Sequence, residues 1–205
     1  MFTGIVTAIG TITKREERGD LRLTISAPLD PARIDIGASI ACSGVCLTVV
    51  ERGGSAGDAW FTVDVSGETV SCTRPGMWEE GSRINIEPSL RLGDELGGHI
   101  VTGHVDSMGK VVAKDAAGDS TRLEIRAQPA LAPYIAAKGS ITLDGTSLTV
   151  NSVQDQSDGS CDFVLNIIRH TAEVTTLGAL KPGDSVNLEI DVLARYLKRM
   201  QSLAG

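Results

Sequence analysis

Short runs rich in Val, Ile and Thr, each bounded by Gly or Asp, follow one another along the chain and predict β-strands. In the first half these apolar runs lie near residues 2–13, 21–26, 39–51, 60–66 and 82–87. In the second half they lie near residues 100–113, 121–126, 140–153, 162–168 and 184–190. The segments 28–37 and 129–139 begin with proline and end with glycine, which predicts a short helix or turn at the same place in each half. The pattern therefore predicts an all-β protein made of two similar units.

An internal repeat supports this division. The stretch 38–50 returns as 139–151 without a gap, and six of the thirteen aligned pairs are identical. The identical pairs are Ser39/Ser140, Ile40/Ile141, Gly44/Gly145, Leu47/Leu148, Thr48/Thr149 and Val49/Val150. A duplicated unit implies two similar folds and two similar pockets, an arrangement suited to chemistry that joins two copies of one molecule. We predict an N-terminal domain at 1–98, a C-terminal domain at 99–190 and a tail at 191–205.

Each unit has six or so short strands and one helical connection. This favours a small closed antiparallel barrel, because closure removes exposed strand edges. A sandwich of two sheets is the alternative that the pattern leaves open. Residues 87–98 break the strand pattern and predict a short linker, so we expect the two units to stay close together.

The tail changes to the period of a helix. Asp191 can cap a helix whose apolar positions are three and four residues apart. These positions are Leu193, Tyr196, Leu197, Met200 and Leu203. The apolar stripe has two interpretations: the helix folds back on its own barrel, or it joins copies of the chain.

Composition and charge narrow the function classes. The chain has 205 residues, 19 basic and 26 acidic side chains and a formal charge of −7, and no run of Lys or Arg is longer than a pair. A nucleic-acid partner is therefore not expected. The chain begins without a basic leader segment and has no apolar stretch as long as a membrane span, so we expect a cytoplasmic protein without a membrane partner. The four cysteines have no metal or disulfide spacing and are expected to be free thiols.

The three histidines, His99, His104 and His170, do not predict a metal site. His99 and His104 are five residues apart inside a predicted strand, and an odd separation sends their side chains to opposite faces. No other cluster of His, Cys and Asp has ligand spacing, so no metal is expected. The nucleophile elbow, the P-loop and the Rossmann glycine fingerprint are also missing, which argues against the commonest hydrolases, NTPases and dinucleotide enzymes.

The repeated turn is the strongest candidate for chemistry. Gly44 and Gly145 let the backbone approach a ligand closely, and a threonine four positions further on supplies a hydroxyl group. Cys46 in the first copy corresponds to Ser147 in the second. Two interpretations of Cys46 stay open, a small buried apolar residue or a reactive thiol.

Five motifs stand in order along the two repeats. They are MFTGIV at 1–6, GVCLTV at 44–49, LGGHIVTGHV at 96–105, DGTSLTV at 144–150 and TTLG at 175–178. In this order, and over essentially the whole chain, they resemble riboflavin synthase of the α-chain type.

The resemblance implies an activity and an assembly. Riboflavin synthases convert two molecules of 6,7-dimethyl-8-ribityllumazine into riboflavin and 5-amino-6-ribitylaminouracil by moving a four-carbon unit, and they need no cofactor. The implied fold is two six-stranded antiparallel Greek-key barrels with a C-terminal α-helix. The family forms a homotrimer in which the N-terminal barrel of one chain faces the C-terminal barrel of another, with one lumazine in each. The alternative is a fluorescent lumazine or flavin carrier, similar to lumazine protein, that has lost turnover.

The resemblance also implies the substrate contacts. In the N-terminal barrel they are Gly4, Ile5, Val6, Val45, Cys46, Leu47, Asp64, Val65, Ser66, Gly67, Glu68 and Thr69. In the C-terminal barrel they are Gly103, His104, Val105, Ser147, Leu148, Thr149, Ile167, Ile168, Arg169, His170 and Thr171, while Lys138 reaches a ligand in the neighbouring chain. His170 departs from the family, which commonly has an acidic residue there, and Val45 stands where the family commonly has another residue.

Six residues are the implied candidates for catalysis, and they are Cys46, His104, Ser39, Ser147, Thr149 and Asp191. We expect His104 to assist proton transfer at the lumazine in the C-terminal barrel, and Ser147 and Thr149 to bind its ring or polarise a proton path. Cys46 or an activated water adds to the lumazine in the N-terminal barrel, with Ser39 and Asp191 in support.

Overall fold

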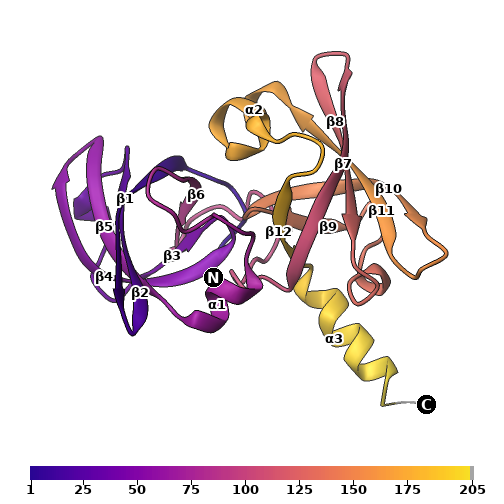
Figure 1. Ribbon diagram of the computed structural model, residues 1–205, viewed down its shortest axis with the longest axis horizontal. Helices are drawn as coiled ribbons and strands as arrows, with labels where there is room; N and C mark the ends of the chain where they lie inside the picture. Colours follow the sequence, from indigo (N-terminus) through magenta and orange to yellow (C-terminus); the bar gives the residue numbers. More distant parts are fainter. Residues whose placement is uncertain (204–205) are drawn as a thin grey trace.

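Two closed barrels of six antiparallel strands lie side by side in the computed structural model, which describes residues 1–203 (Figure 1). The first barrel consists of β1 (Ala8–Arg18), β2 (Asp20–Ala27), β3 (Ser39–Cys42), β4 (Val45–Ser55), β5 (Asp58–Val65) and β6 (Arg83–Pro88). The second consists of β7 (Ser107–Ala117), β8 (Ser120–Ala127), β9 (Ser140–Leu143), β10 (Thr146–Asp155), β11 (Cys161–Ile168) and β12 (Ser185–Ile190). The strand order is β1-β2-β5-β4-β3-β6 in the first ring and, starting from β7, β7-β8-β11-β10-β9-β12 in the second. The prediction of two similar Greek-key barrels is confirmed.

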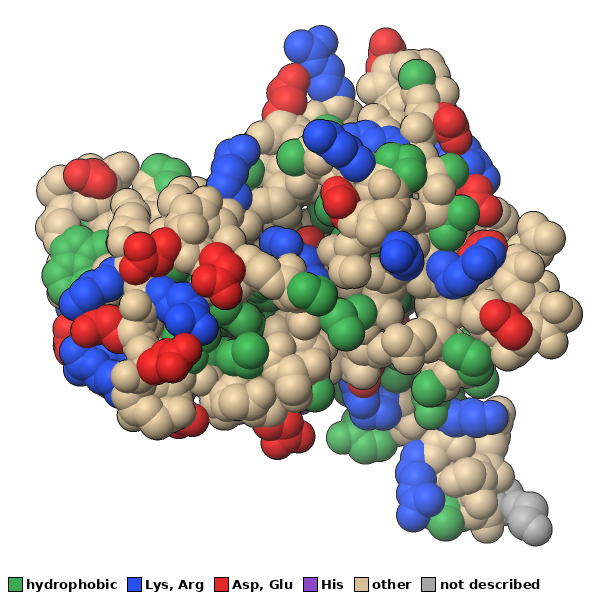
Figure 2. Space-filling model, in the orientation of Figure 1, with side chains coloured by type: hydrophobic (Ala, Val, Ile, Leu, Met, Phe, Trp, Pro, Cys, Tyr) green, Lys and Arg blue, Asp and Glu red, His purple; other side chains and the backbone are tan. Residues whose placement is uncertain are grey.

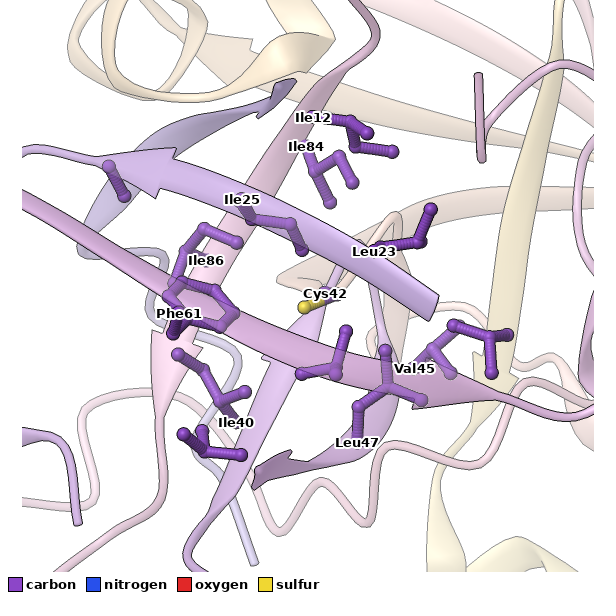
Figure 3. Packing of buried hydrophobic residues seen from close by; sticks show 14 of the residues in the cluster. Ile12, Leu23, Ile25, Ile40, Cys42, Val45, Leu47, Phe61, Ile84 and Ile86 are labelled. Carbon is purple, nitrogen blue, oxygen red and sulfur yellow. The ribbon is translucent and has the colours of Figure 1, made fainter. Parts of the chain in front are cut away.

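Alternating side chains form the core of each barrel. Along β2, Leu21, Leu23, Ile25 and Ala27 are buried, and the residues between them are at least partly exposed. The two-residue period of a strand sends the buried set to the interior. Figure 3 shows aliphatic side chains from several strands of the first barrel in one cluster with Phe61. Burial of each such side chain stabilises the folded state by about 1.5–3 kcal/mol.

The third apolar run of each half, predicted as one segment, folds into two strands joined by a tight turn. Ser43 and Gly44, between β3 and β4, have φ angles of 45° and 85°. Asp144 and Gly145, between β9 and β10, have φ angles of 44° and 78°. Glycine adopts such angles without steric cost, which explains why glycine recurs at this position.

The first apolar run of each half begins later than the sequence predicts. Strands β1 and β7 start at residues 8 and 107, and the segments 1–7 and 98–106 before them are largely irregular. We call these the first and second crossing segments. One isolated bridge, between Phe2 and Val101, joins them.

A glycine in each crossing segment interrupts the strand geometry. Gly4 has a φ angle of 75° and Gly103 one of 79°. His99 and His104 therefore do not lie in one strand, and the prediction that placed them on opposite faces of a strand was wrong.

Short helices occupy matching places in the two halves. The 3₁₀ segments η1 (Pro31–Arg33) and η2 (Ala132–Tyr134) lie within the segments where a short helix or turn was predicted, and η3 (Thr176–Ala179) lies before β12. The helices α1 (Gly67–Cys72) and α2 (Arg169–Val174) follow β5 and β11. Within residues 1–203 no helix combines the length and apolar character that a membrane crossing needs.

The terminal helix α3 (Val192–Gln201) projects away from the second barrel (Figures 1 and 2). Asp191 caps it, as predicted, and accepts a hydrogen bond from the Leu193 amide at 2.9 Å. The apolar side chains of the stripe are 60% to 70% exposed, and they are Leu193, Tyr196, Leu197, Met200 and Leu203. The helix is therefore not folded back on its own barrel. Residues 204 and 205 of the predicted tail lie outside the described residues.

The two repeated turns pack against each other where the barrels meet. A Cβ atom on Gly44 would lie 2.9 Å from the Gly145 amide nitrogen, so glycine allows the two backbones to approach. The side-chain amides of Asn85 and Asn187 donate hydrogen bonds to main-chain carbonyls of the opposite turn, at 2.9 and 3.0 Å. These reciprocal contacts place equivalent parts of the two barrels face to face.

Candidate functional site

The side chains of the repeated turn that can do chemistry lie on the outer face of each barrel. On β4, Val45 and Leu47 are buried, whereas Cys46 between them points outwards and is half-buried. On β10, Ser147 is also only partly buried, and Leu148 packs against the core. Leu47 and Leu148, both predicted contacts, therefore help to build the barrels.

Each crossing segment lies on the repeated turn of the opposite barrel. The Gly4 carbonyl accepts a hydrogen bond from the Ser147 amide at 2.8 Å, and the Gly103 carbonyl accepts one from the Cys46 amide at 2.8 Å. Within this chain, the grouping is the reverse of the predicted one, which put Gly4 with Cys46 and Gly103 with Ser147. The physical reason is close packing: a Cβ on either glycine would lie 2.6 Å from the Cβ of the residue below it.

A pocket of about 220 Å³ opens beside Cys46. It is lined by Val45, Cys46, Glu68, Thr69, Cys72, Thr73, Gly103, His104 and Val105. The structure thus brings His104 and Cys46 together, although the sequence assigned them to different barrels. Cys72 and Thr73 were missed by the sequence analysis. The signal that could have found them is their place one helical turn after Glu68 and Thr69.

The equivalent place on the second barrel is covered by a histidine. The Ser147 Oγ atom lies 2.7 Å from Nδ1 of His99, and a Cβ on Gly98 would lie 2.8 Å from the Ser147 Cβ. Burial lowers the pKa of His99, while the negative charge of Asp191 acts in the opposite direction. A neutral imidazole can accept the proton of a serine hydroxyl group through Nδ1.

The sequence did not predict this contact of His99 with Ser147. The available signal was the Gly-Gly-His sequence at 97–99, since two glycines allow a chain to pass close to another element. The His99 Nε2 atom is buried and has no hydrogen-bond partner among residues 1–203. In the same described part of the chain, no three His, Cys, Asp or Glu side chains are placed to hold a metal ion.

The other predicted contacts of the first barrel lie at the end of β5 and in α1. Val65 is fully buried, and Ser66 caps α1 by accepting a hydrogen bond from the Thr69 amide at 3.2 Å. The Arg22 guanidinium holds both carboxylate oxygens of Asp64, at 2.7 and 2.8 Å. This pairing keeps the pKa of Asp64 below its usual range. Asp64 therefore cross-links β2 and β5 on the barrel wall.

The predicted contacts at the end of β11 and in α2 have varied surroundings. Ile167 is buried and Ile168 is exposed. Arg169 pairs with Glu173 at 2.8 Å, and His170 is exposed on α2. The Thr171 carbonyl accepts the hydroxyl group of Thr175 at 2.6 Å.

We call the pocket beside Cys46 and the Ser147–His99 pair the two half-sites. The remaining candidates do not line the Cys46 pocket. Ser39 pairs with Thr48 of β4 and lines a separate pocket of about 170 Å³. Thr149 and Lys138 are exposed, and so is Ile5, whereas Val6 is half-buried. Lys138 has a φ angle of 67°, which is uncommon for a residue with a side chain.

A larger hollow, of about 470 Å³, lies on the outer wall of the first barrel beside Trp60. Its charged side chains already pair with one another, as Lys14 and Arg18 do with Glu16 at 2.9 and 3.1 Å. This hollow includes no residue of the repeated turns or of the crossing segments.

Comparison with known proteins agrees with the duplicated architecture. The family model described as "Lumazine binding domain" matches residues 3–89 and again residues 102–191. Riboflavin synthase of Brucella abortus is 49% identical over 204 residues, covering 98% of each chain, and that of Mycobacterium tuberculosis is 44% identical over 207 residues, covering both chains fully. The chain belongs to the riboflavin synthase family. In this member of the riboflavin synthase family, each family-model match contains one barrel and one repeated turn.

Solved structures show the same fold. The crystal structure of LumP complexed with riboflavin has a TM-score of 0.75 and 25% identity, covering 93% of this chain and 99% of that chain. LumP complexed with 6,7-dimethyl-8-(1'-D-ribityl) lumazine also has a TM-score of 0.75, at 22% identity. This chain therefore shares its two-barrel fold with LumP.

Proposed function

We propose that the chain is a riboflavin synthase, which converts two molecules of 6,7-dimethyl-8-ribityllumazine into riboflavin and 5-amino-6-ribitylaminouracil. The observation that carries the proposal is the pair of equivalent half-sites with unequal chemistry, Cys46 beside a pocket and Ser147 beneath His99. Duplication lets both barrels, in the units 1–98 and 99–190, bind the same molecule. The unequal side chains let one lumazine donate the four-carbon unit and the other accept it.

The chemistry requires a choice of roles. The methyl group on C7 of the lumazine is acidic, because its carbanion delocalises into the ring, so one copy must lose a proton and the other must be attacked. Cys46 or a water molecule adds to the lumazine in the first barrel, and His104 moves protons in that same pocket. Ser147, with His99 as its base, acts at the lumazine in the second barrel. Holding the two rings in register supplies much of the rate.

The supporting roles are less direct. Lys138 and Thr149 are exposed, so their side chains can contact a ligand or another chain. Ser39 lies on the same outer face as Cys46, and Asp191 lies close enough to His99 to affect its charge. We assign these four residues to ring binding and to the support of proton transfer, without a bound cofactor.

We also propose that the enzyme is a homotrimer. The pocket of about 220 Å³ is smaller than the roughly 300–1,000 Å³ that usually enclose a small ligand. A barrel from a second chain would close this half-site and bring a second lumazine against the first. The exposed apolar stripe of α3 supports association, because water contact with such a stripe is unfavourable. We place the protein in the cytoplasm, where a reducing environment keeps the Cys46 thiol reduced.

Turnover of purified protein tests the proposed reaction. Mixing the protein with 6,7-dimethyl-8-ribityllumazine should give riboflavin and 5-amino-6-ribitylaminouracil in equal amounts, followed by absorbance and chromatography. Cys46→Ser and His104→Gln should each lower kcat, while both variants still bind riboflavin. If both variants keep the wild-type kcat, the assignment of Cys46 and His104 is wrong.

A lumazine or flavin carrier is the second candidate, because the solved structures of LumP share the fold. The higher identity to riboflavin synthases, 49% against 25%, favours the enzyme. The same mixing experiment separates the two functions. Stable fluorescence of bound lumazine, with no riboflavin formed, would identify a carrier.

A further inference from the structure

Two buried glutamates occupy equivalent places in the two barrels. Glu87 lies on β6 and Glu189 on β12, and their exposed fractions are only 6% and 2%. A buried carboxylate is costly unless strong hydrogen bonds offset its loss of hydration. The partners of both glutamates are main-chain amides and a threonine hydroxyl group in the crossing segments.

Glu189 binds three consecutive residues of the second crossing segment. Its Oε1 atom accepts hydrogen bonds from the amide and the hydroxyl group of Thr102, at 2.7 and 2.6 Å. Its Oε2 atom accepts hydrogen bonds from the amides of Gly103 and His104, at 2.9 and 3.1 Å. Four donors on two oxygens determine the position of this short stretch of backbone.

Glu87 binds the first crossing segment in the same way. Its Oε1 atom accepts hydrogen bonds from the amide and the hydroxyl group of Thr3, at 2.7 and 2.8 Å, and its Oε2 atom accepts one from the Gly4 amide at 3.0 Å. The two clamps therefore hold matching stretches, and each glutamate lies on the barrel into which its own crossing segment leads.

The clamped backbone continues directly onto the opposite half-site. The Gly103 amide donates a hydrogen bond to Glu189 of the second barrel, and the Gly103 carbonyl accepts one from the Cys46 amide of the first barrel at 2.8 Å. Gly4 is held by Glu87 of the first barrel and offers its carbonyl to Ser147 of the second at 2.8 Å. Each half-site therefore combines a turn from one barrel with a backbone stretch positioned by the other.

We propose that Glu189 is a positioning residue that holds the backbone at 102–104 so that His104 enters the Cys46 pocket, and that Glu87 does the same for residues 3–4 over Ser147. The inference rests on the proposed function, because it assigns the clamps to the two half-sites of that reaction. On this proposal, Glu189 affects the reaction only through the position of His104. Glu87 serves the other half-site and is the matched control within the same chain.

The substitution Glu189→Gln tests the clamp with little change in shape. A glutamine side chain has one oxygen and one NH₂ group, so in either orientation the NH₂ group would face at least one backbone amide of residues 102–104. We expect the stretch 102–104 to shift while the barrel remains folded. Thr102→Val, which removes one of the four hydrogen bonds, is the milder variant if Glu189→Gln fails to fold.

A double-mutant cycle separates positioning from general damage. We expect Glu189→Gln to lower kcat by about ten-fold or more, with KM within about three-fold of the wild type, since small displacements of catalytic groups cost large factors in rate. The double variant Glu189→Gln/His104→Gln should have nearly the same kcat as the single variant His104→Gln. In the double variant Glu87→Gln/His104→Gln, by contrast, the fold-losses in kcat of the two single variants should multiply. A wild-type kcat for Glu189→Gln, or multiplicative losses with His104→Gln, would overturn the proposal.

Amide hydrogen exchange tests the clamp without turnover and so distinguishes its failure from that of the proposed function. Glu189→Gln should speed exchange of the amides of 102–104 by about ten-fold or more, and Glu87→Gln should do so at residues 3 and 4. If the wild type makes no riboflavin, the proposed reaction fails, and these exchange rates still decide the clamp. Unchanged exchange at 102–104 in Glu189→Gln would refute it.

Discussion

At the scale of single residues, one difference between the two repeats is a side chain buried where the barrels meet. Asp144 stands where the first repeat has Ser43, and its carboxyl group is almost fully buried. Its Oδ1 atom accepts a hydrogen bond from the Asn187 amide at 2.9 Å, and its Oδ2 atom lies 3.4 Å from Nε of Arg74. Burial raises the pKa of Asp144 to about 6, although Arg74 and the Asn187 amide act to lower it.

This shift predicts a pH dependence of stability. The folded state holds the Asp144 proton more tightly than the unfolded state does, so the contribution is fully present below about pH 4 and is lost as the pH rises through about 6. We expect Asp144→Asn, compared with the wild type, to gain about 2 kcal/mol in relative unfolding free energy between pH 4 and pH 8. Urea unfolding at several pH values measures this difference. Parallel curves for the two proteins would contradict it.

Lys138 offers a second test at the residue scale, because its φ angle of 67° matches the 85° of Gly37 in the first repeat. Lys138→Gly relieves backbone strain of about 1 kcal/mol, and the greater freedom of glycine in the unfolded chain offsets most of that gain. Stability should therefore stay within about 1 kcal/mol of the wild type. If Lys138 contacts a ligand, KM for the lumazine should rise. An unchanged KM would remove Lys138 from the site.

At the scale of elements, the sequence predicted the features that depend on neighbouring residues, such as turns and helix caps. Glycine recurs in both repeated turns because positions 44 and 145 have positive φ angles. The N-cap and the apolar stripe of α3 follow from the identity and spacing of its residues. The crossing segments were predicted as strands because they are rich in Ile, Val and Thr. Their actual course depends on hydrogen bonds to Glu87 and Glu189, which are more than 80 residues away in sequence. Such long-range contacts leave no periodic signal in the sequence, so the position of His104 in the Cys46 pocket could not be predicted.

The contact between the two turns gives a prediction for an element. A Cβ on Gly145 would lie 2.6 Å from the Gly44 amide nitrogen, whereas one on Gly76, with a similar φ angle of 73°, would meet nothing within 4 Å. Gly76→Ala should therefore cost about 1 kcal/mol from backbone strain alone. Gly145→Ala should cost at least about 2 kcal/mol more, because the barrels must move apart. Equal unfolding free energies for the two variants would show that the turns do not support each other.

At the scale of the whole molecule, two similar barrels share their parts instead of standing alone. The turns, the asparagines at 85 and 187 and the crossing segments all connect one barrel to the other by reciprocal contacts. This arrangement presents both half-sites on the outside of the barrels, where a second chain can reach them. Under the proposed function, the single chain holds two lumazine sites in fixed relation, and we expect the pairing of two substrates to require a further barrel from a partner.

Assembly through α3 is the prediction that belongs to this scale. The helix projects from the second barrel (Figure 1). Its apolar stripe is exposed, and an ion pair of 2.7 Å between Arg195 and Asp106 holds its first turns. Truncation after Ile190, or the double substitution Leu197→Asp and Met200→Asp on the stripe, should convert a trimer to smaller species, because charges cannot be buried in an apolar contact.

Arg199→Glu is the matched control, since it also changes charge on α3 but leaves the stripe intact. Native mass measurement reports the number of chains. Turnover of the lumazine should fall together with the trimer, because in the proposed assembly a barrel from a second chain completes each site. A stable trimer after truncation would show that the barrels alone hold the chains together. Full turnover by a monomer would instead show that two lumazines meet within one chain.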